Sequence, residues 1–328
     1  MERFGKHLRA LLYVSLVAVV AYLGFVLWSG AGEAWRAAQR VGWGGGALLL
    51  ALSCFNYAVR FGRWQYYLTC LGHRVPVGPS LRYYLASFAF TATPGKLGEG
   101  VRSFYLRAHG VPFSESLSAL FVERLFDLSA TLLLAALGVL YFGRYLPLVL
   151  VPVGVVLLVL LLLNSARFRG WLRSFHIRRL GGVLDGLESA SILSRGPRLA
   201  VGLFLSLLGW GAEATAFHLT VTLLGLDIPW VASFGIYGLA ISIGAISFLP
   251  GGLGGTEATM LVLLGVTGAS TADAGAATIL LRLATLWFAV VLGIGFMLGL
   301  RGRDVGSVGA VTGDAVTGDD VVGLEKPT

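Results

Sequence analysis

The chain interrupts its apolar segments twice with a Pro-Gly-x-Leu-Gly stretch, in TATPGKLGEG at residues 91–100 and in SFLPGGLGGTEA at residues 247–258. A Pro-Gly pair ends a helix, because proline lacks an amide donor and clashes with the preceding turn. Inside a membrane, the freed backbone groups survive only where protein buries them or where they line a wet cavity. If the flanking helices lie in a membrane, both stretches predict helices that break within the molecule.

The segments around these breaks have the composition of a membrane protein. Of the 328 residues, 56% are hydrophobic and 13% are charged, whereas soluble domains carry about 25% charged residues. Apolar runs of about 20 residues recur, and VPVGVVLLVLLLL (151–163) lacks the alternation of a barrel strand. The sequence predicts an all-α polytopic membrane protein. It excludes an ordinary soluble enzyme, a disordered protein and, with only two cysteines, a disulfide scaffold.

The apolar periodicity predicts where the helices lie. We expect them at 8–28, 43–59, 81–93, 117–142, 145–164, 199–226, 230–249, 256–266 and 272–300. Two of these segments, 81–93 and 256–266, are short for a bilayer core of about 30 Å. Each adjoins one of the two breaks, so we expect each to dip into the membrane rather than cross it alone.

Basic residues concentrate in residues 1–9, 60–82 and 165–198, the last with seven arginines against two acids. Lysine and arginine favour cytoplasmic loops, so all three segments are predicted to be cytoplasmic, with Arg60 and Arg63 marking the cytoplasmic end of the second helix. The net charge of +8 then reflects this bias and anionic lipid headgroups, and no nucleic-acid partner is expected.

This charge pattern fits one path of the chain through the membrane. Residues 81–116 enter from the cytoplasm and return, and residues 231–268 enter from outside and return. The result is six full crossings, two re-entrant hairpins and two cytoplasmic termini. Residues 230–249 are long enough to cross the membrane, so the alternative is a path with eight or nine full spans. We therefore expect about six to eight transmembrane helices.

We expect one transmembrane domain, 1–300, with repeat halves at about 81–164 and 231–300. Residues 165–198 are predicted to form a basic amphipathic connector at the cytoplasmic surface. Residues 301–328 repeat AVTGD and lack apolar periodicity, which predicts a disordered cytoplasmic tail.

The two breaks head an internal repeat. Each is followed by a glutamate, Glu99 or Glu257, and then by a helix with an arginine, Arg124 or Arg282. The spacing from proline to arginine is 30 residues in the first copy and 32 in the second. The predicted path gives the copies inverted topology, as in many secondary transporters. The helix N-termini that the breaks expose would suit an anion such as a phosphate headgroup.

Charged side chains at membrane depth are expected to have a structural or functional role, because each costs about 2.5–3.5 kcal/mol on insertion scales. They could line a polar cavity or form structural ion pairs that hold the helices in register. The candidate headgroup-binding residues are Lys96, Glu99, Arg124, Glu257 and Arg282. The candidate coupling or ion-pair residues are Glu123, Asp127 and Glu213. The candidate backbone-break residues are Pro94, Gly95, Gly98, Pro250, Gly251 and Gly254.

With these residues in hand, the sequence resembles the transmembrane-region family of lysylphosphatidylglycerol synthases. The matching stretches are TATPGKLGEGVRSFYL (91–106) with ALFVERLFDLSATLLL (119–134), and SFLPGGLGGTEA (247–258) with AATILLRLATLWFAVVLG (276–293). The resemblance implies a flippase-like protein of a prokaryotic cell (inner) membrane. The synthase domain of fused members is absent from this sequence, so aminoacyl transfer is not implied.

Three functions follow as hypotheses. The first is a translocase for an anionic phospholipid, a polyprenyl phosphate or a glycolipid, without direct use of ATP because no Walker motif is present. The second is a non-transporting partner that scaffolds a separate lipid synthase. The third is a membrane-embedded headgroup enzyme, which the lack of HExxH, paired histidines and GxSxG disfavours.

We therefore expect no catalytic residue, metal or cofactor. The expected ligand is a membrane lipid with an anionic headgroup. A homo-oligomer and a lipid-synthase partner remain open.

Overall fold

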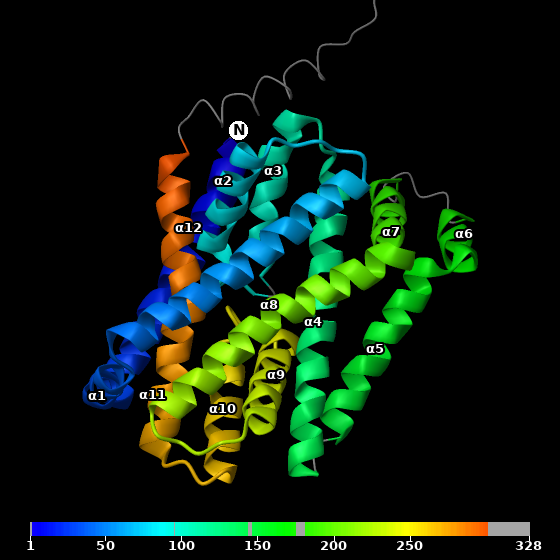
Figure 1. Ribbon diagram of the computed structural model, residues 1–328. Helices are drawn as coiled ribbons and strands as arrows, with labels where there is room; N and C mark the ends of the chain where they lie inside the picture. The colour runs from blue at the N-terminus through cyan, green and yellow to red at the C-terminus, as the bar shows by residue number, and fades with distance from the viewer. Residues whose placement is uncertain (1, 95, 144–145, 175–180, 301–328) are drawn as a thin grey trace, which may run out of the picture.

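The computed structural model describes residues 2–94, 96–143, 146–174 and 181–300, and every regular element within these ranges is a helix (Figure 1). The β pairing described there is one isolated bridge, between Pro94 and Pro250. The elements are α1 (Glu2–Cys70), α2 (Val77–Ser87), η1 (Phe88–Phe90), η2 (Leu97–Val101), α3 (Arg102–Leu106), η3 (Arg107–His109), α4 (Phe113–Phe142), α5 (Leu146–Asn164), α6 (Ala166–Ser174), α7 (Gly181–Leu193), α8 (Gly196–Leu223), α9 (Trp230–Ile246), α10 (Gly255–Val266), α11 (Thr271–Arg282), the π-helical η5 (Leu283–Trp287) and α12 (Phe288–Gly299).

Several helices are long and apolar enough to cross a membrane. Four of them satisfy both criteria within the described residues: Gly32–Cys70, Phe113–Phe142, Gly196–Leu223 and Thr271–Gly299. A fifth is added if Val149–Asn164 and Ala166–Leu172, which meet at a 72° bend, form one span. The protein is therefore a polytopic membrane protein.

The remaining predicted segments are helical, with shifted ends. The predicted span 8–28 forms the first part of α1, a helix that changes direction along its length (Figure 1) and in which Gly42 has a φ of +65°. The predicted helix 81–93 begins earlier, at Val77, and continues through η1. The helix predicted at 256–266 is α10, which begins one residue earlier. The predicted tail 301–328 and Gly95 lie outside the described residues.

Two short helical hairpins enter the bundle from opposite ends. Helices α2 and α3 lie toward the top of Figure 1, and α9 and α10 lie toward the bottom. The tips of the hairpins carry the two Pro-Gly breaks, and they meet at the Pro94–Pro250 bridge. Two stretches 156 positions apart in the sequence (250 − 94) thus lie side by side in the interior.

Helices α4 and α9 join the two halves of the chain and approach so closely that backbone meets backbone. A Cβ atom on Gly235 of α9 would lie 2.1 Å from Cα of Gly138 on α4, and one on Gly238 would lie 2.4 Å from the Ala135 nitrogen. Membrane helices approach this closely only where small residues face each other. The α4–α9 crossing therefore fixes how the two hairpins sit relative to each other.

The predicted connector 165–198 contains α6 and α7. Helix α6 carries arginines beside an exposed Trp171, and α7 packs against α4 near Ser118. Its cytoplasmic location stays a prediction.

Candidate functional site

The Thr93 side chain makes two hydrogen bonds across the first break. The Thr93 hydroxyl donates to the Phe90 carbonyl at 2.7 Å and accepts from the Gly98 N–H at 2.8 Å. A side chain at position 98 would meet Phe90 Cβ at 2.6 Å, so this approach requires glycine. The turn delivers Glu99 to the interior, where its side chain is fully buried and accepts a hydrogen bond from Thr91 Oγ1 at 3.1 Å.

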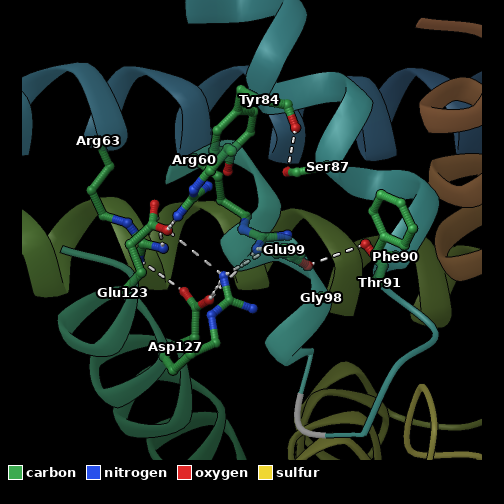
Figure 2. A network of polar contacts seen from close by, with 12 residues as sticks. Arg60, Arg63, Tyr84, Ser87, Phe90, Thr91, Gly98, Glu99, Glu123 and Asp127 are labelled. Atoms are coloured by element: carbon green, nitrogen blue, oxygen red, sulfur yellow. Dashed lines mark hydrogen bonds and ion pairs between the residues drawn. The ribbon is translucent and has the colours of Figure 1, made fainter. Parts of the chain in front are cut away.

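Buried arginines of α1 face buried carboxylates of α4 (Figure 2). Arg63 Nη1 lies 2.8 Å from Asp127 Oδ1, and Arg63 Nη2 lies 3.7 Å from Glu123 Oε1. Arg60 Nη2 lies 3.7 Å from Glu99 Oε2 and 3.9 Å from Asp127 Oδ2. Glu99 therefore links the first break to α1 directly and to α4 through Arg60.

Two further arginines complete this network. Arg102 pairs with Glu123, and its guanidinium lies 3.6 Å from the ring centroid of Trp64, a cation–π contact. Arg124 Nη2 lies 3.2 Å from Asp127 Oδ2 and 3.6 Å from Glu99 Oε2. We call this group the arginine–carboxylate cluster: Arg60, Arg63, Arg102, Arg124, Glu99, Glu123 and Asp127. Its four cations outnumber its three anions by one when all are charged.

The prediction that Arg60 and Arg63 mark the end of the second helix is wrong. Their exposed fractions are 4% and 0%, because α1 continues as a helix to Cys70 and carries both residues into the interior. Arg102 was not predicted at all. The i,i+3 spacings Arg60/Arg63 and Glu99/Arg102 place each pair on one helical face, which is the signal that could have found them.

A smaller ion pair holds the second break. Arg282 Nε lies 2.7 Å from Glu257 Oε1, and Arg282 Nη2 donates to the Gly251 carbonyl at 2.7 Å. Glu257 Oε2 also accepts the Gly254 N–H at 2.7 Å, which caps the first turn of α10. Gly251 and Gly254 have φ values of +62° and +84°. Arg282–Glu257 thus pairs an arginine with the glutamate of the second break, as Arg124–Glu99 does at the first.

A cavity of about 530 Å³ lies between the two breaks. Its polar wall includes four cations, Arg60, Lys96, Arg124 and Arg282, against the two carboxylates of Asp127 and Glu213. The apolar part of its lining comes mainly from α4, α5 and α9. The cavity is therefore amphipathic, and its polar wall carries an excess of positive charge.

Three residues that line the cavity make further polar contacts. Lys96 has a left-handed φ of +56°, and its Nζ lies 5.3 Å from the ring centroid of Trp210. Glu213 accepts a hydrogen bond from the Tyr237 hydroxyl. Tyr57 donates to the Thr285 carbonyl at 2.6 Å, within η5. π-Helical turns such as η5 often occur at functional sites.

Comparison with known proteins assigns the family. Residues 13–293 match the lysylphosphatidylglycerol synthase TM region. The chain belongs to this family. The resemblance predicted from the two motif-bearing segments is confirmed.

Two relatives from Methanothermobacter thermautotrophicus (strain ATCC 29096 / DSM 1053 / JCM 10044 / NBRC 100330 / Delta H) are each named "UPF0104 membrane protein". One is 28% identical over 323 residues, covering 88% of this chain and 94% of the relative. The other is 27% identical over 319 residues, covering 86% and 91%. The similarity therefore extends over nearly the whole length of each protein.

In this member of the family, the structure brings the predicted headgroup-binding residues to two neighbouring places. Lys96, Arg124 and Arg282 line the cavity, whereas Glu99 and Glu257 lie behind it as the partners of the two arginines. Of the predicted coupling residues, Asp127 and Glu213 line the cavity and Glu123 lies deeper in the arginine–carboxylate cluster. The described residues contain no group of His, Cys, Asp and Glu side chains that could hold a metal ion.

Proposed function

We propose that this family member is a translocase that moves an anionic lipid headgroup through the cavity between the two breaks. The observation that carries this proposal is the set of four cations that line this cavity, between helices long and apolar enough to cross a membrane. A phosphate entering the cavity would neutralise the excess positive charge.

The unsatisfied donors of the cavity wall support an anion with several oxygens. Nε and Nη2 of both Arg60 and Arg124 are buried and have no aligned hydrogen-bond acceptor, and neither has Trp210 Nε1. Buried donors without an acceptor are costly. A phosphate offers several acceptor oxygens to donors that come from different helices.

The apolar side of the cavity supports a lipid rather than a soluble anion. Phe121, Val155, Phe248 and Leu249 line the cavity and remain 46–67% exposed. In a bilayer these side chains would face hydrocarbon. Acyl or prenyl chains can therefore stay in the membrane while the headgroup occupies the polar wall.

We further propose that the two hairpins are re-entrant and form an inverted repeat. Three observations support this: they enter the bundle from opposite ends, their tips meet, and each break pairs its glutamate with an arginine of a following helix. The proposed path has six full crossings in a prokaryotic cell membrane, with both termini in the cytoplasm.

The proposal assigns movement rather than bond chemistry to this site. Glu99, Glu123, Asp127 and Glu257 each contact at least one arginine. A carboxylate that contacts a buried guanidinium in this way acts as its counter-ion, which is unsuited to a nucleophile.

The test is movement of fluorescent lipids in sealed proteoliposomes made with wild type, Arg124→Ala, Arg282→Ala and Arg74→Ala. Arg74 lies on the exposed loop after α1 and serves as the matched control. The cargo panel contains an anionic phospholipid, a polyprenyl phosphate, a glycolipid and a zwitterionic phospholipid.

We expect Arg124→Ala and Arg282→Ala to slow movement about 10- to 100-fold, because a hydrogen bond to a charged group contributes about 1.5–3 kcal/mol. Arg74→Ala should move lipid at the wild-type rate. No movement of any cargo by folded wild type would contradict a translocase and favour the scaffold. Conversion of the lipid to a new product would favour an enzyme.

A further inference from the structure

A second, smaller cavity reaches the Arg282–Glu257 pair from the other side. It has a volume of about 240 Å³ and is bounded by α10, α11 and the Glu33 region of α1. Its lining runs from Thr271, at the start of α11, to Thr278 and Glu257. We call it the α10–α11 groove. In the proposed path, its Thr271 end lies at the non-cytoplasmic face.

The ion pair lies between the two cavities. Glu257 lines the α10–α11 groove but not the central cavity, whereas Arg282 lines the central cavity but not the groove. The two side chains meet at 2.7 Å. A group that reaches Glu257 through the groove therefore acts on a cation that faces the substrate.

The equivalent pair in the first repeat differs in this respect. Glu99 has an exposed fraction of 0% and lines neither of the two cavities. It also contacts two arginines, Arg60 and Arg124, whereas the ion pair of Glu257 is with Arg282. Of these two carboxylates, Glu257 can therefore be reached from the α10–α11 groove and Glu99 cannot.

From this arrangement we propose that the α10–α11 groove carries a proton to Glu257 and that lipid movement is coupled to this proton. The inference rests on the proposed translocase function. Protonation of the Glu257 carboxylate removes its negative charge and frees Arg282. A lipid phosphate then replaces the carboxylate as the anion on Arg282, so one proton and one negative charge enter together.

Charge balance explains why the protonation of Glu257 and the binding of a phosphate to Arg282 occur together. A buried guanidinium without a counter-ion is strongly unfavourable, so Arg282 leaves Glu257 only when another anion is at hand. Glu257 likewise becomes neutral when Arg282 turns to the phosphate. When the lipid leaves into the opposite leaflet, Glu257 releases its proton to that same side by way of the central cavity, which Arg282 lines, and the original pair re-forms.

Other charged groups face this pair from each neighbouring helix. Glu33 lines the groove, and the Arg40–Asp273 ion pair, at 3.2 Å, lies by the start of α11. On the cavity side, Glu213 and Tyr237 interact electrostatically with Arg282. Glu213 is held by the Tyr237 hydroxyl and contacts no arginine within ion-pair distance among the described residues. Glu257 is thus the carboxylate that both contacts Arg282 and faces the groove.

The first experiment tests whether the groove is aqueous, without any need for transport. Gly275→Cys and Thr278→Cys are made in a background of Cys54→Ser and Cys70→Ser, and labelled in sealed vesicles with a membrane-impermeant thiol reagent. Space for the new side chain exists at Gly275, where a Cβ meets only Leu261 at 3.9 Å. Leu161→Cys, on the exposed apolar face of α5, is the control.

We expect Gly275→Cys and Thr278→Cys to react from the same side as Asp227→Cys, in the α8–α9 loop, and Leu161→Cys not to react. Arg74→Cys should react from the opposite side. Protection of both groove positions in folded protein would overturn the proposal.

The second experiment measures the coupling. Proteoliposomes of known protein orientation receive a gradient of one pH unit, acidic on the groove side. With one proton per lipid, the anionic lipid should accumulate about tenfold in the opposite leaflet, since one pH unit is a tenfold ratio of proton activity. Glu257→Gln should abolish this accumulation, whereas Glu115→Gln, beside His73 at the surface, should keep it.

The outcomes separate this inference from the proposed function. Lipid movement that ignores the pH gradient in wild type would overturn the coupling and leave the translocase intact. No lipid movement in wild type would remove both, whatever the labelling shows. Accumulation that persists in Glu257→Gln would assign the proton to another residue and contradict the inference.

Discussion

The effect of removing one charged side chain from this molecule depends on all of its ion-pair partners, as Arg63 shows. Its two terminal nitrogens contact Asp127 and Glu123, its exposed fraction is 0%, and it also donates to the Ser206 hydroxyl. Removal of this one side chain would leave two carboxylates buried beside fewer cations. The net contribution of a buried ion pair is small, but the cost of breaking it is large.

Arg63→Met should therefore lower the free energy of unfolding by about 3–5 kcal/mol, since it keeps the volume and removes the charge. Thermal unfolding in detergent, followed by circular dichroism, measures this loss. The exposed Arg74→Ala should change stability by less than about 0.5 kcal/mol. If the thermal unfolding midpoint of Arg63→Met equalled that of wild type, the arginine–carboxylate cluster would not stabilise the fold.

Sequence reasoning identified four of the seven residues of this cluster. Glu99, Glu123, Arg124 and Asp127 stood out because they lie in or beside a break or inside an apolar helix. Arg63 did not, because its partner Asp127 is 64 positions away and a run of arginines after an apolar segment also fits a cytoplasmic loop. Which of the two applies depends on tertiary packing, which no local pattern encodes.

At the scale of helices, the α4–α9 crossing depends on the absence of side chains. Gly138 and Gly235 bring the two backbones into contact, so even a methyl group must push the helices apart. Such overpacking costs about 1–3 kcal/mol.

The elements differ in how far the sequence predicts them. The start of α10 was predictable within one residue from the Pro-Gly break. The π-helical turn η5 was not, because its carbonyls are stabilised by the hydroxyls of Ser53 and Tyr57, which are distant in the sequence.

Gly235→Ala should lower the thermal unfolding midpoint by an amount that corresponds to about 1–3 kcal/mol. Gly211→Ala is the matched control, because a Cβ there meets nothing within 4 Å in the middle of α8. That control should be neutral or stabilising, since alanine favours helix more than glycine. Equal effects of the two substitutions would contradict a backbone contact at the crossing.

Tyr57→Phe should destabilise the protein by about 1–3 kcal/mol, because the buried Thr285 carbonyl loses the hydroxyl that binds it at 2.6 Å. Tyr141→Phe, on an exposed face of α4, is the control. Unfolding midpoints that do not differ between the two variants would show that η5 does not need this hydrogen bond.

At the scale of the whole molecule, the two halves touch at the tips of their hairpins. The Pro94–Pro250 bridge joins the breaks next to the central cavity. If a headgroup passes between the hairpins, the tips have to separate during each cycle. A covalent link at this point tests that movement directly.

Pro94→Cys with Pro250→Cys, in the background without Cys54 and Cys70, should form a disulfide on oxidation, because paired Cα atoms in such a bridge lie about 4.5–5.5 Å apart. We expect the oxidised protein to lose lipid movement in proteoliposomes and to regain it on reduction. Pro94→Cys alone should be insensitive to oxidant. Wild-type movement by the cross-linked protein would mean that the tips stay together throughout.

The arginine–carboxylate cluster also has a consequence for how the chain is made. Arg63 is synthesised 64 residues before Asp127, and a ribosome adding about 5–20 residues per second takes roughly 3–13 s to cover that distance. During this interval Arg60 and Arg63 have no α4 carboxylate to bind, so their long side chains are expected to reach for the membrane surface. We therefore expect the Arg60–Arg63 part of α1 to take its final position only after α4 has been synthesised, so that an earlier helix is completed by a later one.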